Sequence, residues 1–163
     1  MRLFVAIELS EDMKKAAVQI LHSLKQNGVK GNYTPVQNMH VTLCFIGEVS
    51  DSRIIEEALS AVKFKPFKLG FTELGNFGDL LHIGTRGGQG INNLANDIRK
   101  ALDAAGIEYD RKKFTPHITL VRKSSGKPGK IEIPNADMMV KRVSLMRSDN
   151  VNGKMVYTRI WEI

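Results

Sequence analysis

The sequence Phe114-Thr115-Pro116-His117-Ile118-Thr119-Leu120-Val121-Arg122 has a counterpart earlier in the chain, at Asn38-Met39-His40-Val41-Thr42-Leu43-Cys44-Phe45. Each copy contains the pattern His-x-Thr-Leu among apolar and β-branched residues, which predicts a β-strand. Side chains at positions i and i+2 leave the same face of a strand, so the histidine and the threonine of each copy point together while their neighbours face a core. One copy is typical of a half-exposed sheet edge. Two copies in a chain with only four histidines indicate a functional site.

The composition limits what such a site can belong to. A chain of 163 residues can bury one core, so we expect a single two-lobed domain over residues 1–163. The net charge of +7 favours an anionic partner, and we expect nucleic acid rather than a membrane. No apolar run approaches the roughly 18 residues of a spanning helix, and we expect a cytoplasmic monomer. The single cysteine, Cys44, excludes an internal disulfide and predicts a small buried side chain.

Hydrophobic periodicity predicts the order of the elements. In chain order they are a strand at 2–8, a helix from Ser10 to Gly28, an extended linker at 31–39, the His40 strand, a short helix capped by Ser50 or Asp51, a strand at 67–72, a turn at 75–79, a strand at 80–85, a helix at 94–105, the His117 strand, and a hairpin of 140–147 with 155–163. The Gly87–Gly90 cluster matches no phosphate-binding glycine pattern and predicts a flexible turn.

The two halves of the chain repeat this order. A strand, a helix, a glycine and His40 are matched by a strand, a helix, a glycine and His117. Val5 precedes His40 by 35 positions, and Ile83 precedes His117 by 34. Matched spacing indicates structural duplication, and a pseudo-twofold axis would bring the two His-x-Thr strands face to face.

The other two histidines carry a weaker signal. His22 lies outside the apolar stripe of its helix and is expected at the surface. His82 alternates with apolar neighbours in a strand, where a histidine more often faces solvent or is hydrogen-bonded than acts in catalysis.

Two histidines and two hydroxyl groups across a groove suit acid–base chemistry on a phosphodiester. Imidazole titrates near neutral pH, so one copy can act as base while the other acts as acid. Thr42 and Thr119 can each donate a hydrogen bond to a phosphoryl oxygen. A metal site is the main competing use of paired histidines. No Asp, Glu or Cys stands at ligand spacing beside His40 or His117, so we expect neither a metal nor a cofactor.

The chain resembles the two-histidine phosphoesterases, and among them the RNA 2′,3′-cyclic phosphodiesterases, which are also called 2′-5′ RNA ligases. The resemblance rests on Met1–Ile7, Asn38–Gly47 and Phe114–Arg122. It implies an α+β fold, bilobal and duplicated, in which two antiparallel sheets line a central groove with helices outside. It also implies hydrolysis of an RNA 2′,3′-cyclic phosphate to a 2′-phosphomonoester, with weak 2′-5′ ligation in reverse.

The resemblance assigns roles to both motifs. His40 would protonate the leaving 3′-oxygen, and His117 would activate water. Thr42 and Thr119 would hold the phosphate.

Arg122 and Phe45 are the candidate substrate-binding residues. Arg122 stands where the family has a phosphate-binding arginine, although a solvated charge at the start of a basic loop is the alternative. Strand parity places both residues on the core-facing side of their strands. Arg122 therefore needs a bulge or a strand end to reach the groove, and parity favours a core position for Phe45.

Two alternatives remain open from the sequence. A related phosphodiesterase could act on 2′-5′ linked oligonucleotides or on small nucleotide phosphodiesters. A non-catalytic RNA-binding module would need only the basic charge, and the paired His-x-Thr motifs would then have no purpose.

Overall fold

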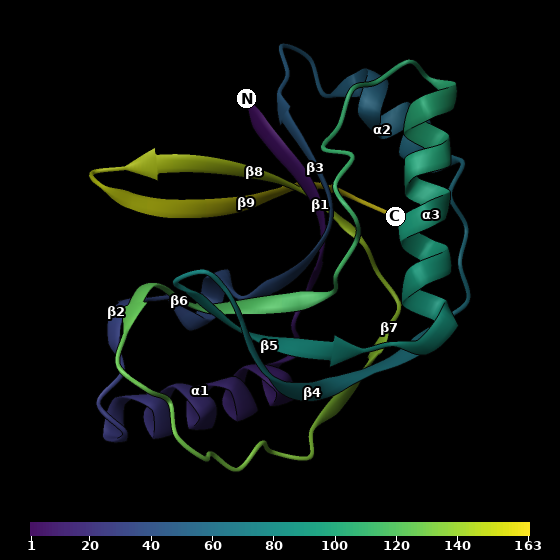
Figure 1. The fold of residues 1–163 in the computed structure, drawn as a ribbon. Coiled ribbons are helices and arrows are strands. Elements are labelled where there is room, and N and C mark those ends of the chain that lie inside the picture. Colours follow the sequence, from purple (N-terminus) through teal and green to yellow (C-terminus); the bar gives the residue numbers. More distant parts are fainter.

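The strands of the computed structural model, which describes residues 1–163, form two antiparallel sheets with the α-helices outside them (Figure 1). The elements are β1 (Arg2–Glu8), α1 (Glu11–Gln26), β2 (Lys30–Tyr33), the 3-10 helix η1 (Val36–Asn38), β3 (His40–Glu48), α2 (Arg53–Ser60), β4 (Phe67–Phe77), β5 (Leu80–Arg86), α3 (Gly88–Ala104), β6 (His117–Ser125), β7 (Asp137–Val140), β8 (Ser144–Val151) and β9 (Lys154–Glu162). The predicted α+β fold with two antiparallel sheets is confirmed.

The sheet topology reflects the sequence repeat. One sheet has the order β3-β1-β8-β9 and the other β2-β6-β5-β4-β7. In each sheet the motif strand, β3 or β6, pairs antiparallel with the strand that opens its half of the chain, β1 or β5. The helices are exchanged: α1 follows β1 but lies against the five-stranded sheet, and α3 follows β5 but packs against β3 (Figure 1).

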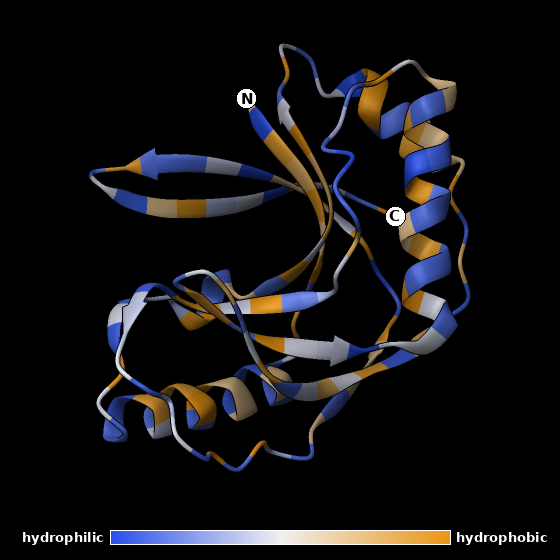
Figure 2. Cartoon of the chain, in the orientation of Figure 1, coloured by the Kyte–Doolittle hydropathy of each residue, from blue (hydrophilic) through white to orange (hydrophobic).

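The core joins the two sheets. A cluster of 33 buried residues includes side chains from both sheets and all three α-helices. Leu3, Val5 and Ile7 of β1 enter it from one side, and Figure 2 shows how hydrophobic residues follow the strands and form stripes on the helices. Cys44 is buried as predicted, and burial raises the pKa of its thiol to about 11. No helix has the length and the apolar character that crossing a membrane would require.

The linker between α1 and β3 is more ordered than predicted. The segment predicted to be extended at 31–39 contains part of β2, which pairs with β6, and the helix η1. β2 carries little hydrophobic signal because its residues, Lys-Gly-Asn-Tyr, are mostly polar and exposed, and its pairing depends on a strand far along the chain. Gly31 permits this pairing, since a Cβ there would lie 2.7 Å from Val121 Cγ1.

Two glycine-rich stretches also differ from their predicted turns. β4 continues through Gly75 to Phe77, so the turn is shorter than 75–79, because pairing with β5 overrides the weak strand preference of glycine. The Gly87–Gly90 cluster leads into α3, whose first residue is Gly88. A Cβ on Gly90 would lie 2.7 Å from Phe67 Cβ, so the glycine allows close packing of helix against strand.

Gly90→Ala tests this packing. Alanine in a helix normally gains about 0.5–1 kcal/mol over glycine, but overpacking against Phe67 costs about 1–3 kcal/mol, so we expect a net loss of stability. The free energy of unfolding, measured by urea denaturation, is the readout. Gly70→Ala is the control, because a Cβ at Gly70 would approach nothing closer than 3.4 Å. Equal or greater stability of the Gly90→Ala variant would contradict the packing argument.

Candidate active site

The two His-x-Thr strands meet although they belong to different sheets. β3, which carries His40 and Thr42, contacts β6, which carries His117 and Thr119. All four side chains are partly exposed. Val41, between His40 and Thr42, and Ile118, between His117 and Thr119, are buried. The structure therefore brings together the four residues that the repeat predicted.

Both catalytic candidates are held in the same tautomer. His40 Nδ1 lies 2.7 Å from the carbonyl oxygen of Asn38, and His117 Nδ1 lies 2.7 Å from that of Thr115. A carbonyl oxygen only accepts hydrogen bonds, so in both rings Nδ1–H is the donor. Nε2 is consequently the nitrogen that takes up or releases a proton in each half of the site.

Thr42 introduces a difference between the halves. Its Oγ1 lies 2.9 Å from His40 Nε2, so the hydroxyl donates to that nitrogen when the imidazole is neutral. The corresponding hydroxyl of Thr119 makes no hydrogen bond with His117. His40 Nε2 is therefore already hydrogen-bonded to its threonine, whereas His117 Nε2 is not.

The electrostatic surroundings of His40 favour its neutral form. Burial is the largest effect and lowers the pKa of His40, against the hydrogen bond to Asn38, which raises it. The charges of His117 and Arg122 lower the pKa further, and the carboxylate of Glu8 raises it. The influence of Arg122 also shows that its guanidinium lies within electrostatic reach of His40.

Each motif strand contains one extra residue just after its threonine. Pairing with β1 skips Leu43, and pairing with β5 skips Leu120; β3 has a second extra residue further on, at Ile46. The flanking pairs are Ala6–Thr42, Val5–Cys44, His82–Thr119 and Leu81–Val121. In both strands the extra residue and the residue after it are buried, as expected for a β-bulge, and the alternation of faces is reversed beyond it.

The bulge corrects the predicted orientation of Phe45. Parity favours a core position for Phe45, and the ring does pack against hydrophobic side chains, but after the bulge these belong to a small separate cluster of Phe4, Ala6 and Met146 rather than to the main core. The guanidinium of Arg2 lies 4.9 Å from the centre of the Phe45 ring. Phe45 thus lies on the same face as His40.

The same bulge acts on Arg122, which occupies the position equivalent to Phe45. In a regular strand Arg122 would face the core, so it can leave that face only beyond a bulge. β6 contains such a bulge. Its side chain is exposed rather than buried. The structure therefore places both predicted substrate-binding residues on the groove side of their strands.

Aromatic rings flank both histidines, and the sequence analysis missed them. On the His40 side, the ring centres of Phe4 and Tyr157 lie 4.9 and 5.2 Å from that of His40. On the other side, Phe77 lies 5.1 Å from His117. Phe4 belongs to an apolar strand run and Phe77 to a predicted turn, so neither had a sequence signal of its own.

His82 is the fourth groove residue that the sequence analysis did not select. Its ring centre lies 5.1 Å from that of His117, its side chain is 9% exposed, and it makes no hydrogen bond within the chain. The expectation of a solvent-facing or hydrogen-bonded histidine is therefore wrong. A signal existed: Leu81 and Ile83 both enter the core, so strand parity sends His82 to the opposite, groove-facing side.

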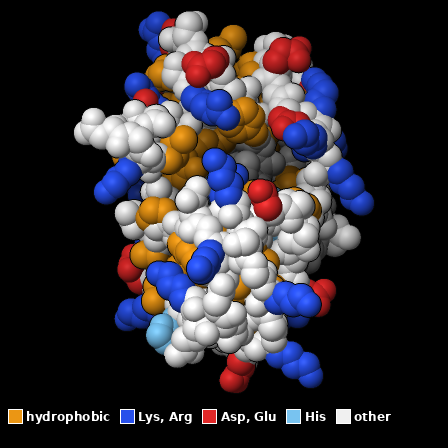
Figure 3. Space-filling view, turned by 60° about the vertical axis from the view of Figure 1, so that its left-hand side comes forward, with side chains coloured by type: hydrophobic (Ala, Val, Ile, Leu, Met, Phe, Trp, Pro, Cys, Tyr) orange, Lys and Arg blue, Asp and Glu red, His pale blue; other side chains and the backbone are white.

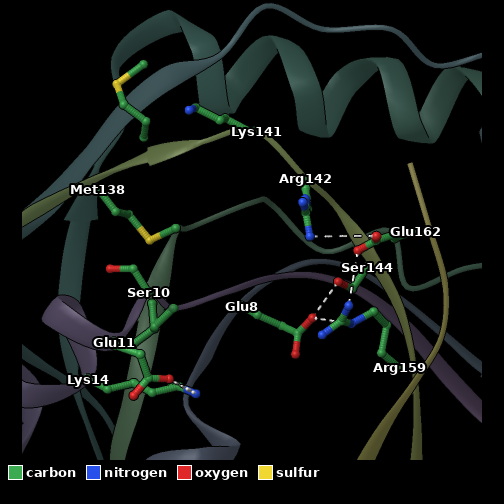
Figure 4. A pocket seen from close by; sticks show the side chains of 12 residues that line it. Glu8, Ser10, Glu11, Lys14, Met138, Lys141, Arg142, Ser144, Arg159 and Glu162 are labelled. Carbon is green, nitrogen blue, oxygen red and sulfur yellow. Dashed lines mark hydrogen bonds and ion pairs between the residues drawn. The ribbon is translucent and has the colours of Figure 1, made fainter.

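A hollow of about 410 Å³ is lined by Glu8, Ser144, Arg159 and Glu162 among others (Figure 4). There the carboxylate of Glu8 accepts a hydrogen bond from Ser144 Oγ at 2.7 Å and pairs with Arg159 Nε at 2.9 Å, while Arg159 also pairs with Glu162. Glu162 has a second partner in Arg142, whose Nη1 lies 3.9 Å from its carboxylate. Glu8 pairs directly across from His40 in the sheet. These contacts therefore hold in place the carboxylate that raises the pKa of His40.

The wider surface is basic, in keeping with the net charge of +7. Figure 3 shows Lys and Arg side chains around apolar side chains in a hollow on one face of the molecule. No group of three or more His, Cys, Asp or Glu side chains is placed to hold a metal ion.

Comparison with known proteins gives a consistent result. The family model of the 2′-5′ RNA ligase superfamily matches residues 10–152. An RNA 2′,3′-cyclic phosphodiesterase of Archaeoglobus fulgidus is 35% identical, over 75% of this chain and 72% of that protein. The Escherichia coli protein of the same name is 32% identical, over 96% of this chain and 92% of that protein. The crystal structure of E. coli LigT with 3′-AMP has a TM-score of 0.85 and 26% identity, covering 99% of this chain and 96% of that one.

The charges around His40 can be tested by NMR titration of its ring proton. Arg122→Gln removes a positive charge and should raise the pKa of His40. Glu8→Gln removes a negative charge and should lower it. The opposite signs make each variant the control for the other, since general loosening of the groove would move both values in the same direction. An unchanged or lowered pKa in Arg122→Gln would show that Arg122 does not reach the groove.

Proposed function

The chain belongs to the 2′-5′ RNA ligase superfamily, and on that premise we propose that it hydrolyses the terminal 2′,3′-cyclic phosphate of an RNA to a 2′-phosphomonoester. The observation that carries the proposal is the pair of His-x-Thr strands in contact, with both Nδ1 atoms committed to carbonyl groups. Each Nε2 atom is then available for proton transfer. Both relatives carry the name of this activity, and the basic surface suits an RNA substrate.

In the proposed reaction, water attacks phosphorus opposite the bond to the 3′-oxygen. His117 Nε2 accepts a proton from the water, and His40 Nε2 gives a proton to the 3′-oxygen as its bond to phosphorus breaks. The new hydroxyl oxygen remains on phosphorus, and the phosphate stays on the 2′-oxygen. Thr42 and Thr119 donate hydrogen bonds to phosphoryl oxygens as negative charge grows there. No metal ion takes part.

The assignment of His40 as acid requires a proton that the unliganded protein disfavours. Burial keeps the pKa of His40 low, and the nearby positive charges act in the same direction. A phosphodiester brings a negative charge into the groove, which raises the pKa of a neighbouring imidazole. Binding of the substrate would therefore favour protonation of His40 Nε2. The Thr42 hydroxyl, which lies 2.9 Å from Nε2 in the unliganded protein, would then be free to bind the phosphate.

Arg122 and Phe45 complete the proposed site. The guanidinium of Arg122 can form charge-assisted hydrogen bonds to a phosphoryl oxygen. Phe45, beneath Arg2 on the groove face, offers an apolar surface to the ribose or the base. If a 5′-hydroxyl replaces water in the reverse reaction, the same groups form a 2′-5′ linkage, so weak ligation is part of the proposal. The protein would act as a monomer in the cytoplasm.

Removing either histidine tests the two-histidine mechanism. His40→Ala and His117→Ala should each lower turnover of an RNA 2′,3′-cyclic phosphate by roughly 10²–10⁴-fold, the usual loss for a general acid or base. His22→Ala, on the exposed side of α1, is the matched control and should leave turnover unchanged. A folded His40 or His117 variant with nearly wild-type turnover would rule the mechanism out. Wild-type turnover should also continue in chelator, and a chelator-sensitive rate restored by zinc or manganese would indicate metal catalysis.

The position of the product phosphate tests the assignment of the two histidines. If His40 protonates the 3′-oxygen, in-line attack must leave the phosphate on the 2′-oxygen. An enzyme that removes only 3′-phosphates should therefore leave the product intact. Release of phosphate by that enzyme would mean that the two histidines have exchanged roles or that the substrate binds in the opposite direction.

A further inference from the structure

His82 occupies a special position in the second half of the groove. It stands directly across from Thr119 in the β5–β6 pairing, so the two side chains leave the same face of the sheet. The first half has Ala6 at the equivalent position, across from Thr42. The duplicated scaffold therefore carries an imidazole beside one threonine and only a methyl group beside the other.

The fold makes room for this ring. His82 lies across from Gly75 of β4, where a Cβ would come within 2.7 Å of His82 Cε1. Phe77 packs on it with a distance of 4.4 Å between ring centres, and the His117 ring lies 5.1 Å away. The absence of a side chain at Gly75 and the contact with Phe77 hold the imidazole in one place next to the proposed base.

The two nitrogens of His82 have different surroundings. Nδ1 is fully buried and has no hydrogen-bond partner, whereas Nε2 is not among the fully enclosed atoms. A proton on Nδ1 would be an unpaired N–H in the interior, which costs more than leaving the proton on the accessible nitrogen. Burial, and secondarily the charge of His117, lower the pKa of His82 and so favour the neutral ring, whose single proton belongs on Nε2 by the burial of Nδ1.

We propose that His82 is a third substrate-binding imidazole, whose Nε2–H donates a hydrogen bond to a phosphoryl oxygen on the His117 side of the groove. This inference rests on the proposed phosphodiesterase function. A phosphoryl oxygen is the strongest acceptor that the proposed substrate brings to Thr119, and His82 shares that position in the sheet. Because the ring stays neutral, it can bind the oxygen without competing with His117 for the proton of the water.

Two substitutions separate binding from packing. His82→Phe keeps a flat ring over Gly75 and removes the donor together with the buried, unpaired Nδ1. We expect it to be as stable as the wild type or more stable. It should nevertheless bind inorganic phosphate and turn over the cyclic phosphate about tenfold to a hundredfold less well, the usual effect of losing a hydrogen bond to a charged group.

His82→Gln is the complementary variant, because its amide can present an N–H close to the position of Nε2. It should lose stability through poorer packing and yet recover most of the phosphate affinity. His22→Phe, the same change at an exposed histidine, is the control for both measurements. NMR titration with inorganic phosphate gives the affinity, and the ¹⁵N shifts of the ring should show the His82 proton on Nε2.

A His82→Phe variant with wild-type phosphate affinity and turnover would overturn the proposal, as would a proton on Nδ1 or a wild-type protein that does not bind phosphate. Phosphate binding is measured apart from turnover. A wild-type protein that binds phosphate but does not turn over the RNA substrate would contradict the proposed function, and the affinities of the variants would still decide the role of His82.

Discussion

The extra residue that follows the threonine of each motif strand decides which side chains can reach the groove. A regular strand would send Phe45 and Arg122 into the core, because side chains alternate strictly between the two faces. The bulges at Leu43 and Leu120 place two consecutive residues in the core and reverse the alternation after them. Each strand can therefore present its histidine, its threonine and a third residue to the same space. The bulge is present in both halves, so it belongs to the duplicated design.

The two halves are tied together by reciprocal backbone contacts at these same bulges. Thr34 N, just before the first motif, donates to the carbonyl of Leu120 in the second motif strand at 2.9 Å. Asp110 N, just before the second motif, donates to the carbonyl of Phe45 in the first motif strand at 2.8 Å. Each motif strand is thus secured by the segment that leads into the other. With α1 and α3 exchanged between the sheets, the groove cannot form in one half alone.

The symmetry of the scaffold does not extend to its electrostatics. Both histidines present Nε2 because Nδ1 is bonded to the carbonyl two residues earlier, a purely local arrangement. His40 is buried, bonded to Thr42 and influenced by Glu8, whereas His117 is flanked by a second imidazole, His82. Two copies of one sequence motif therefore have different neighbours. A duplicated fold needs such a difference if one copy is to act as acid and the other as base.

The sequence by itself determined the two motif strands, the strands paired beside them and the pairing of His40 with His117, because these features follow from local periodicity and from a repeat of matched length, while the α+β fold came from the resemblance of the motifs to a known family. It did not determine β2 or the end of β4, whose stability comes from partner strands distant in the chain. Nor did it determine that Phe45 lies on the groove face or that His82, Phe77 and Tyr157 gather around the histidines. Only the tertiary structure decided these positions, because a bulge is defined by pairing with another strand and a ring contact by the approach of segments that are not neighbours in the sequence.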